Sequence, residues 1–178
     1  MSKSSVDTRC LLRGVFPASS IQTLSSLLED TFGAQSEPLH VEDIRLQCTH
    51  PIEIPQAQLM VRRNLIGPNI PSFLINNILQ RTPMSVRMET WHVSTIKGSH
   101  TEFLRSIGMT DVSSKEKEGT RFTFQCFVFD VFYLKGASTE EMIGELQVFC
   151  NSQETAIYEA KLLEFAKALS FIVKLSNL

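Results

Sequence analysis

One acidic side chain, Asp130, stands inside the most apolar stretch of the sequence, where it could do acid–base chemistry. The stretch from Phe122 to Leu134 is rich in Phe, and Asp130 is its only charged residue. A carboxylate buried without a partner is costly, so such a residue either serves a reaction or forms an ion pair. We expect the structural role, with Asp130 near a β-bulge or paired with an arginine such as Arg87 or Arg121.

The other residues with chemical potential are scattered along the chain. His92, beside Trp91, fits a hydrogen-bonded histidine of a sheet better than a base or a ligand. Arg62 and Arg63 are the nearest approach to a basic cluster, and such a pair on a polar strand face is usually solvated rather than bound to phosphate. The four histidines and four cysteines show no metal-ligand spacing. We therefore expect no metal, no cofactor and no catalytic residue.

Antiparallel tunnel barrels that bind or hydrolyse triphosphates are a specific enzymatic alternative. They hold a metal and phosphates with an E-x-E-x-K pattern on strands, because only every second residue of a strand points into the barrel. The nearest match is EKEGT at 116–120, which lacks the final lysine and lies in a hydrophilic segment. VEDIRL (41–46) and VRMETW (86–91) offer isolated charges rather than a ladder. The sequence thus gives a charged tunnel little support.

Composition and missing motifs narrow the function classes. The chain has 178 residues, 43% of them hydrophobic, which suits one domain with a sizeable core. A net charge of −2 gives no argument for non-specific nucleic-acid binding. The polar start MSKSSVDTRC does not resemble a signal peptide, and no apolar run of about 18 residues predicts a transmembrane helix. Nucleotide-binding and hydrolase motifs such as G-x-G-x-x-G and G-x-S-x-G are absent. A cytosolic or nuclear chain with free thiols is expected.

Hydrophobic periodicity and turn residues divide the chain into strands and helices. Strands are expected at 9–17, 39–48, 57–65, 72–80, 84–96, 118–136 and 141–150. Helices are expected at 18–33, 101–107 and 152–175, the last capped by Ser152. The segments 49–56 and 110–119 are expected to be connections.

This division predicts an α+β fold. About seven or eight strands and about three helices follow from it, without βαβ alternation after the first unit. We therefore predict a mostly antiparallel β-barrel with flanking helices, including a C-terminal helix. Residues 1–8 are expected to form a flexible tail, and residues 9–178 a single domain.

The expected strand at 118–136 is unusual because both of its faces are apolar. One face carries Phe122, Phe124, Cys126, Val128 and Phe132, and the other carries Phe127, Phe129, Val131 and Tyr133. The outer face of a barrel strand stays apolar only where something covers it. The chain's own C-terminal helix and a partner subunit are both candidates for that cover.

Several motifs, taken in order, resemble the Mediator head-module family called Mediator subunit 18. LLRGVFPASSIQTLSSLLEDTFG (11–33) is similar to the family's opening strand and leucine-rich helix, and TEFLRSIGM (101–109) to its short helix. GTRFTFQCFVFDVFYL (119–134), ELQVFC (145–150) and LLEFAKALSFIVKL (162–175) resemble its long apolar strand, closing strand and last helix. The sister family, Mediator subunit 20, has a related barrel, but the short helix and the VKL ending favour subunit 18.

The resemblance implies a non-enzymatic β-barrel in the head module of Mediator, a nuclear transcription coactivator of RNA polymerase II. It implies a heterodimer with Mediator subunit 20 and tethering by the C-terminal helix of Mediator subunit 8. Neither direct nucleic-acid binding nor membrane binding is expected. The alternatives are a metal-dependent triphosphate hydrolase or binder, and a carrier that encloses an apolar ligand.

No binding residue of the family can be carried over by motif. The surplus of apolar surface on the expected strand provides a different guide, because such surface is often covered in a complex. We expect partner contact through Phe127, Phe129, Val131 and Tyr133.

Overall fold

The computed structural model of the chain describes residues 5–48, 57–67, 72–79, 86–96, 100–106 and 108–177. The strands within them are β1 (Ser5–Pro17), β2 (Gln35–Cys48), β3 (Ala57–Asn64), β4 (Ser72–Leu79), β5 (Arg87–Ile96), β6 (Met109–Phe124), β7 (Phe127–Leu134) and β8 (Glu141–Cys150). The helices are α1 (Ile21–Ser26), α2 (His100–Ser106) and α3 (Thr155–Ala168). A 3-10 turn η1 (Ala18–Ser20) precedes α1, and a π-helical turn η2 (Leu27–Thr31) follows it.

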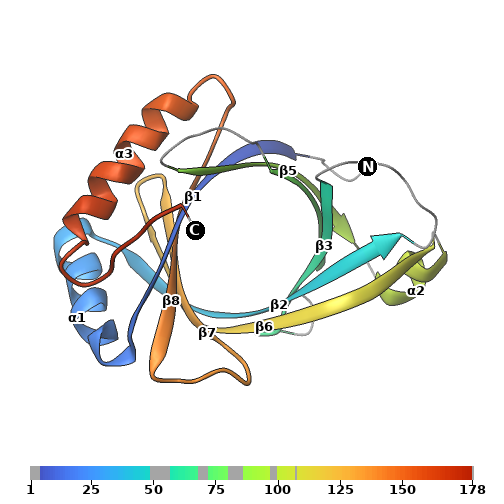
Figure 1. The fold of residues 1–178 in the computed structure, drawn as a ribbon, viewed down its shortest axis with the longest axis horizontal. Coiled ribbons are helices and arrows are strands. Elements are labelled where there is room, and N and C mark those ends of the chain that lie inside the picture. The colour runs from blue at the N-terminus through green and yellow to red at the C-terminus, as the bar shows by residue number, and fades with distance from the viewer. Residues whose placement is uncertain are drawn as a thin grey trace.

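The strands close into a barrel in the order β1-β5-β4-β3-β2-β6-β7-β8, and each neighbouring pair is antiparallel. The ring is closed by β1, which pairs with β5 on one edge and with β8 on the other. Figure 1 shows this ring, with α1 and α3 together on one side and α2 on the other. The predicted α+β barrel with flanking helices is confirmed.

The long apolar segment is a hairpin, so the prediction of one continuous strand is wrong. β6 ends at Phe124, a turn follows at 125–126, and β7 begins at Phe127. The first turn residue has φ of 51°, a left-handed value typical of tight hairpin turns. Because the turn shifts the alternation of side chains, Phe122 pairs with Phe129 on the same side of the sheet. Most of the residues that the sequence pattern assigned to two faces of one strand therefore lie on a single face, which β6 and β7 form together.

Several element boundaries also differ from the sequence predictions. Residues 110–119, expected to be a connection, belong to β6 and pair with β2. Residues 5–8, expected in the tail, belong to β1 and pair with β5. Glu154, not Ser152, occupies the N-cap of α3 and makes no side-chain capping bond. The expected connection at 49–56 lies outside the described residues.

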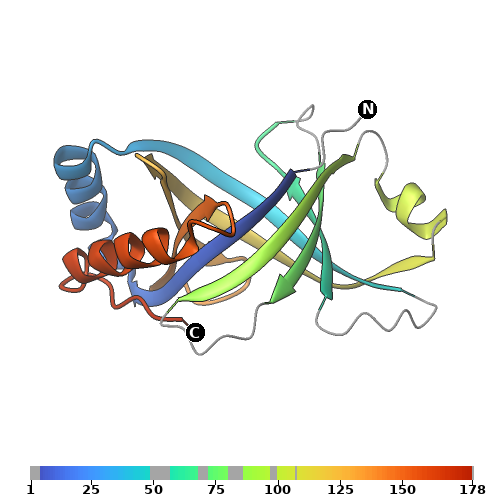
Figure 2. The same ribbon diagram turned by 90° about the horizontal axis from the view of Figure 1, so that it is seen from above.

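A large hydrophobic core lies outside the barrel, between its wall and the helices. Figure 2 shows α1 and α3 stacked against the same end of the sheet. Buried residues of this core include Leu24, Leu28, Phe122, Phe124, Phe127, Phe129, Val131, Leu146, Leu162 and Phe165. In the described part of the chain, no helix has the length and apolar character needed to cross a membrane.

After α3 the chain turns back towards β1, so the prediction of a helix as far as residue 175 is wrong. Arg13 and Ser176 exchange two backbone hydrogen bonds of 2.7 and 2.9 Å. The close approach depends on Gly14, because a Cβ there would lie 2.3 Å from the carbonyl oxygen of Lys174. The last residues thus fasten onto the first strand.

Candidate functional site

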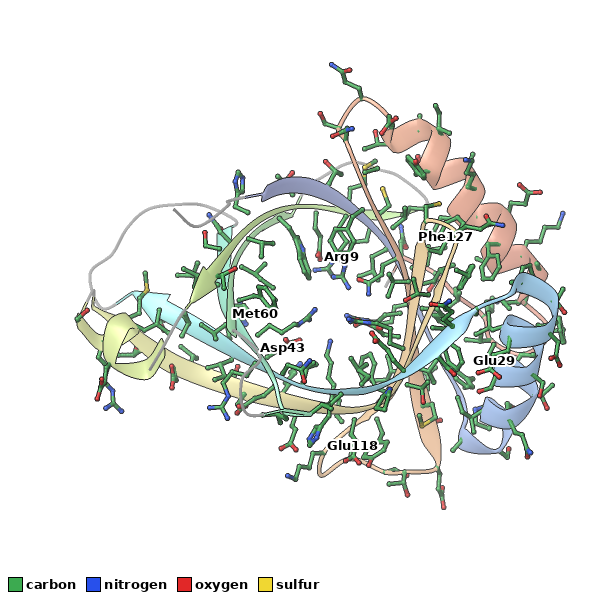
Figure 3. All side chains as sticks on the ribbon, turned by 180° about the vertical axis from the view of Figure 1, so that it is seen from behind. Arg9, Glu29, Asp43, Met60, Glu118 and Phe127 are labelled. Carbon is green, nitrogen blue, oxygen red and sulfur yellow. The ribbon has the colours of Figure 1, made fainter. Side chains whose placement is uncertain are left out.

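The inside of the barrel carries charged side chains contributed by many strands. Alternate residues of a strand share a face, so every second residue points inward. Figure 3 shows Arg9 of β1, Asp43 of β2 and Met60 of β3 within the ring of strands. The charged residues at inward positions are Arg9, Arg13, Asp43, Arg45, Arg62, Arg87, Glu89, Lys115, Lys117, Arg121, Asp130 and Glu145.

Arg9 connects the groups in this interior. Its Nε donates to Gln147 Oε1 at 2.6 Å, and its two terminal nitrogens donate to Glu89 at 3.1 Å and to Glu145 at 3.5 Å. Its guanidinium carbon also lies 4.5 Å from the centroid of the Trp91 ring. Arg9 is 5% exposed, and a charge this deeply buried requires such partners.

Glu145 is surrounded by cations. Arg13 donates to one of its oxygens, and Lys117 and Arg9 each lie 3.5 Å from the other. Burial alone would raise the pKa of Glu145, but the charges of Lys117, Arg9 and Arg13 outweigh burial and lower it to about 2. The carboxylate is therefore ionised at neutral pH and unsuited to act as a general acid or base there.

Asp43 and Glu89 are held in the same way. Asp43 accepts hydrogen bonds of 2.6 and 2.8 Å from Arg62, and Glu89 accepts bonds of 2.8 Å from Arg87 and 2.9 Å from the Trp91 indole. Burial would raise both pKa values, but the charge of Arg62 lowers that of Asp43 to about 2, and the charge of Arg9 lowers that of Glu89. Each carboxylate thus serves as a counter-ion.

Asp130 completes the network on β7. It accepts hydrogen bonds of 2.7 and 2.9 Å from Arg121 and another of 2.9 Å from Gln147 Nε2. The expectation that Asp130 pairs with an arginine such as Arg121 is confirmed. Since Gln147 also accepts from Arg9, hydrogen bonds run without a break from Arg121 to Glu145.

Described residues of the barrel line two of its interior cavities. One, of about 280 Å³, is lined by charged side chains together with Met60, Trp91 and Phe132. The other, of about 370 Å³, is mainly apolar, with Phe73, Ile75 and Val128 in its wall. Arg62 and Trp91 line both cavities, so these two side chains stand at the boundary between them.

The donor atoms of the tunnel do not fit a resident metal ion. Among the described residues, no group of three or more His, Cys, Asp or Glu side chains is arranged to hold one. Lys117 Nζ lies 3.3 Å from Asp43 and 3.5 Å from Glu145, so an ammonium group stands between the carboxylates that a divalent cation would have to bridge. The E-x-E-x-K pattern is also missing from β1, where Arg9 and Arg13 point inward.

Three of the four residues expected to contact a partner lie beneath the chain's own helices. Phe127 is 5% exposed, and Phe129 and Val131 are 0% exposed. The Phe127 ring stacks on Phe165 of α3 with a centroid separation of 5.7 Å. Tyr133 lies outside this cluster and is half-buried, and a hydrogen bond with Glu118 raises its pKa. At the first three positions, the chain itself is the cover, and Tyr133 alone keeps accessible surface.

The prediction that the sequence gives a charged tunnel little support is wrong, because the segments VEDIRL and VRMETW both place charged side chains inside the barrel. Apart from β4, which has no charged residue, each strand contributes only one to three inward charges. These charges become a cluster only in the correct register. The signal available in the sequence was the alternation of side chains along each strand. Asp43 and Arg45 share a face of β2, and Arg87 and Glu89 share a face of β5. Placing those faces inward would have predicted the cluster.

Comparisons with known proteins agree on the architecture. No family model matches the sequence, and no curated protein matches it. A chain in the structure of the Schizosaccharomyces pombe Mediator head module matches with a TM-score of 0.76 and 15% identity, covering 96% of this chain and 98% of that one. A putative adenylate cyclase from Vibrio parahaemolyticus matches with a TM-score of 0.62 and 14% identity, covering 89% and 87%.

A third similar structure is a putative adenylyl cyclase from Hippeastrum with a dominant triphosphatase activity. It matches with a TM-score of 0.60 and 11% identity, covering 94% of this chain and 90% of that one. At these identities the comparisons establish the fold alone. The chain thus shares its overall fold with a chain of the Schizosaccharomyces pombe head module and with the two putative cyclases.

Proposed function

We propose that the chain is a non-enzymatic subunit of a Mediator head module, of the subunit 18 type, acting in the nucleus. It supports transcription by RNA polymerase II through protein–protein assembly. The observation that carries this proposal is the similarity to a chain of the Schizosaccharomyces pombe head module, which spans 96% of this chain and 98% of that one with a TM-score of 0.76. The motif order of the sequence supports the same family.

The chemistry of the tunnel supports a role without catalysis. The carboxylates Asp43, Glu89 and Glu145 are each bound by at least two cations. A catalytic carboxylate needs a pKa near the working pH or a free edge for a metal, and burial among cations removes both. These side chains instead hold the barrel's interior together.

The proposed partners are Mediator subunit 20, as a heterodimer, and the C-terminal helix of Mediator subunit 8. The test is co-expression of the chain with tagged subunits 20 and 8, followed by size-exclusion chromatography with light scattering. An equimolar complex with subunit 20, extended by subunit 8, is the expected result. A well-behaved monomer that binds neither would overturn the proposal.

A metal-dependent triphosphate hydrolase is the second candidate. The cation-lined cavity and the Hippeastrum structure favour it, while Lys117 between Asp43 and Glu145 speaks against it. The deciding assay is phosphate release from tripolyphosphate with manganese present. Turnover abolished by Arg9→Ala would favour the hydrolase over the assembly role.

A further inference from the structure

The smaller cavity of the barrel has a large excess of positive charge. Seven cationic side chains and three carboxylates line it, so cations outnumber carboxylates by four. The three carboxylates are already bound to Arg or Lys partners and are ionised. The remaining positive charge is therefore not compensated by the residues that line the cavity.

The uncompensated charge lies at one end of the cavity. Three cations lie two residues along a strand from an inward-facing member of the ion-pair network. Arg45 follows Asp43 on β2, Arg87 precedes Glu89 on β5, and Lys115 precedes Lys117 on β6. Because side chains alternate along a strand, these cations point into the barrel one level nearer its end. Arg13 of β1 lies at the same end, and the four cations come from four different strands.

Two of these cations have no counter-ion and a third has a free donor. Among the described residues, neither Arg45 nor Lys115 forms an ion pair, and both are exposed. Arg13 Nε is buried and has no hydrogen-bond partner in the same part of the chain. Glu145 therefore satisfies only part of the Arg13 guanidinium.

We propose that this end of the barrel binds a small polyvalent anion, such as an oligophosphate or a polycarboxylate, without a metal ion. Arginine forks bind phosphate and carboxylate oxygens in pairs, and Arg13, Arg45 and Arg87 supply three of them. The low-dielectric wall formed by Met60 and Phe132 strengthens the attraction. No metal is required, because Lys117 already neutralises the two nearest carboxylates. This inference does not depend on the proposed function.

The test is isothermal titration calorimetry of the whole chain with tripolyphosphate in EDTA at low salt, and separately with citrate. The variant Arg45→Gln/Lys115→Gln removes two cations that hold no carboxylate, so its folding is expected to be unchanged. Its matched control, Lys161→Gln/Lys167→Gln, removes the same charge from exposed positions of α3, which packs outside the barrel. Circular dichroism melts of all three proteins confirm that the variants are folded.

We expect wild-type binding that weakens with added salt and falls about tenfold or more in the Arg45→Gln/Lys115→Gln variant, with the control unchanged. Binding of tripolyphosphate but not citrate would show that the site is specific for oligophosphates. Equal binding of citrate would show that the site recognises negative charge rather than phosphate groups. Three results would overturn the proposal: no binding to wild type, equal loss in the control variant, or binding only when manganese replaces EDTA. The last result would instead favour the metal-dependent hydrolase.

Discussion

Arg121 and Asp130 lie directly opposite each other on β6 and β7 and are joined by two hydrogen bonds of 2.7 and 2.9 Å. Asp130 is 4% exposed, and Gln147 Nε2 donates to one of its carboxylate oxygens as well. This arrangement explains how an acidic residue is tolerated in the most apolar part of the sequence. It is a paired counter-ion inside the barrel, while its neighbours Phe129 and Val131 point to the outer core.

Asp130→Ala is expected to lower the free energy of unfolding by about 3 kcal/mol, because it leaves Arg121 and Gln147 without their acceptor. Urea unfolding followed by circular dichroism measures the change. Asp30→Ala, at an exposed position of η2, is the control and is expected to change little. Equal stability of Asp130→Ala and wild type would show that the buried pair contributes nothing.

The stability of the barrel is expected to fall in acid. The pKa of Glu145 is lowered from 4.5 to about 2 in the folded chain, so the folded state stays ionised to a lower pH than the unfolded chain. The contribution, about 3 kcal/mol, is complete above about pH 5 and is lost as the pH falls through the folded pKa.

Glu145→Gln tests this dependence on pH. The variant is expected to be less stable at neutral pH and to lose less stability than wild type between about pH 5 and about pH 2. Urea midpoints across this range measure the slope. The exposed substitution Glu164→Gln is the control. Parallel curves for wild type and Glu145→Gln would contradict the assignment to Glu145.

Gly119→Ala is expected to destabilise the β6–β7 hairpin severely. A Cβ at this position would lie 2.0 Å from the carbonyl oxygen of Val131 and 2.7 Å from Phe132 Cα. These are backbone atoms of a paired strand, so they cannot move aside to relieve the clash. We expect a loss of at least about 3 kcal/mol in chemical unfolding, or insoluble protein. Gly136→Asn is the control, because Gly136 has φ of +85° with open space around it, and Asn tolerates such values.

Phe129→Ser is expected to unfold the isolated chain, since the side chain is 0% exposed in the core beneath α1 and α3. Removing a buried Phe costs about 3 to 5 kcal/mol. Tyr133→Ser should leave the fold intact, because Tyr133 is half-buried outside that core. Melting curves and co-elution with Mediator subunit 20 give the two readouts. Weakened co-elution of a stable Tyr133→Ser protein would support partner contact at that end of β7.

The barrel could be predicted from the sequence because turn residues and prolines separate the strands, and because the strands do not alternate with helices as they would in a parallel sheet. The β6–β7 hairpin could not, because Gln125 and Cys126 give no Asn-Gly or Asp-Gly signal, and the apolar residues run on across the turn. The polar first half of β6 was missed for the opposite reason. Its residues are exposed and alternate weakly, so only pairing with β2 makes them a strand.

The candidate site was hidden from the sequence by a different effect. Glu89 and Glu145 meet at Arg9 although they are separated by many residues along the chain. Only the register of β1 against β5 and β8 brings them together. The prediction for Asp130 succeeded because Arg121 is its close neighbour through the hairpin.

The position of β1 between β5 and β8 sets the order of events during synthesis. Within this barrel β1 is synthesised before β8, so its second edge stays unpaired until β8 is made, and the bridge between Arg13 and Ser176 forms later still. Contacts of such long sequence separation form slowly. A nascent chain therefore carries an open edge of β1 until almost all of the barrel has been made, and open edges invite aggregation.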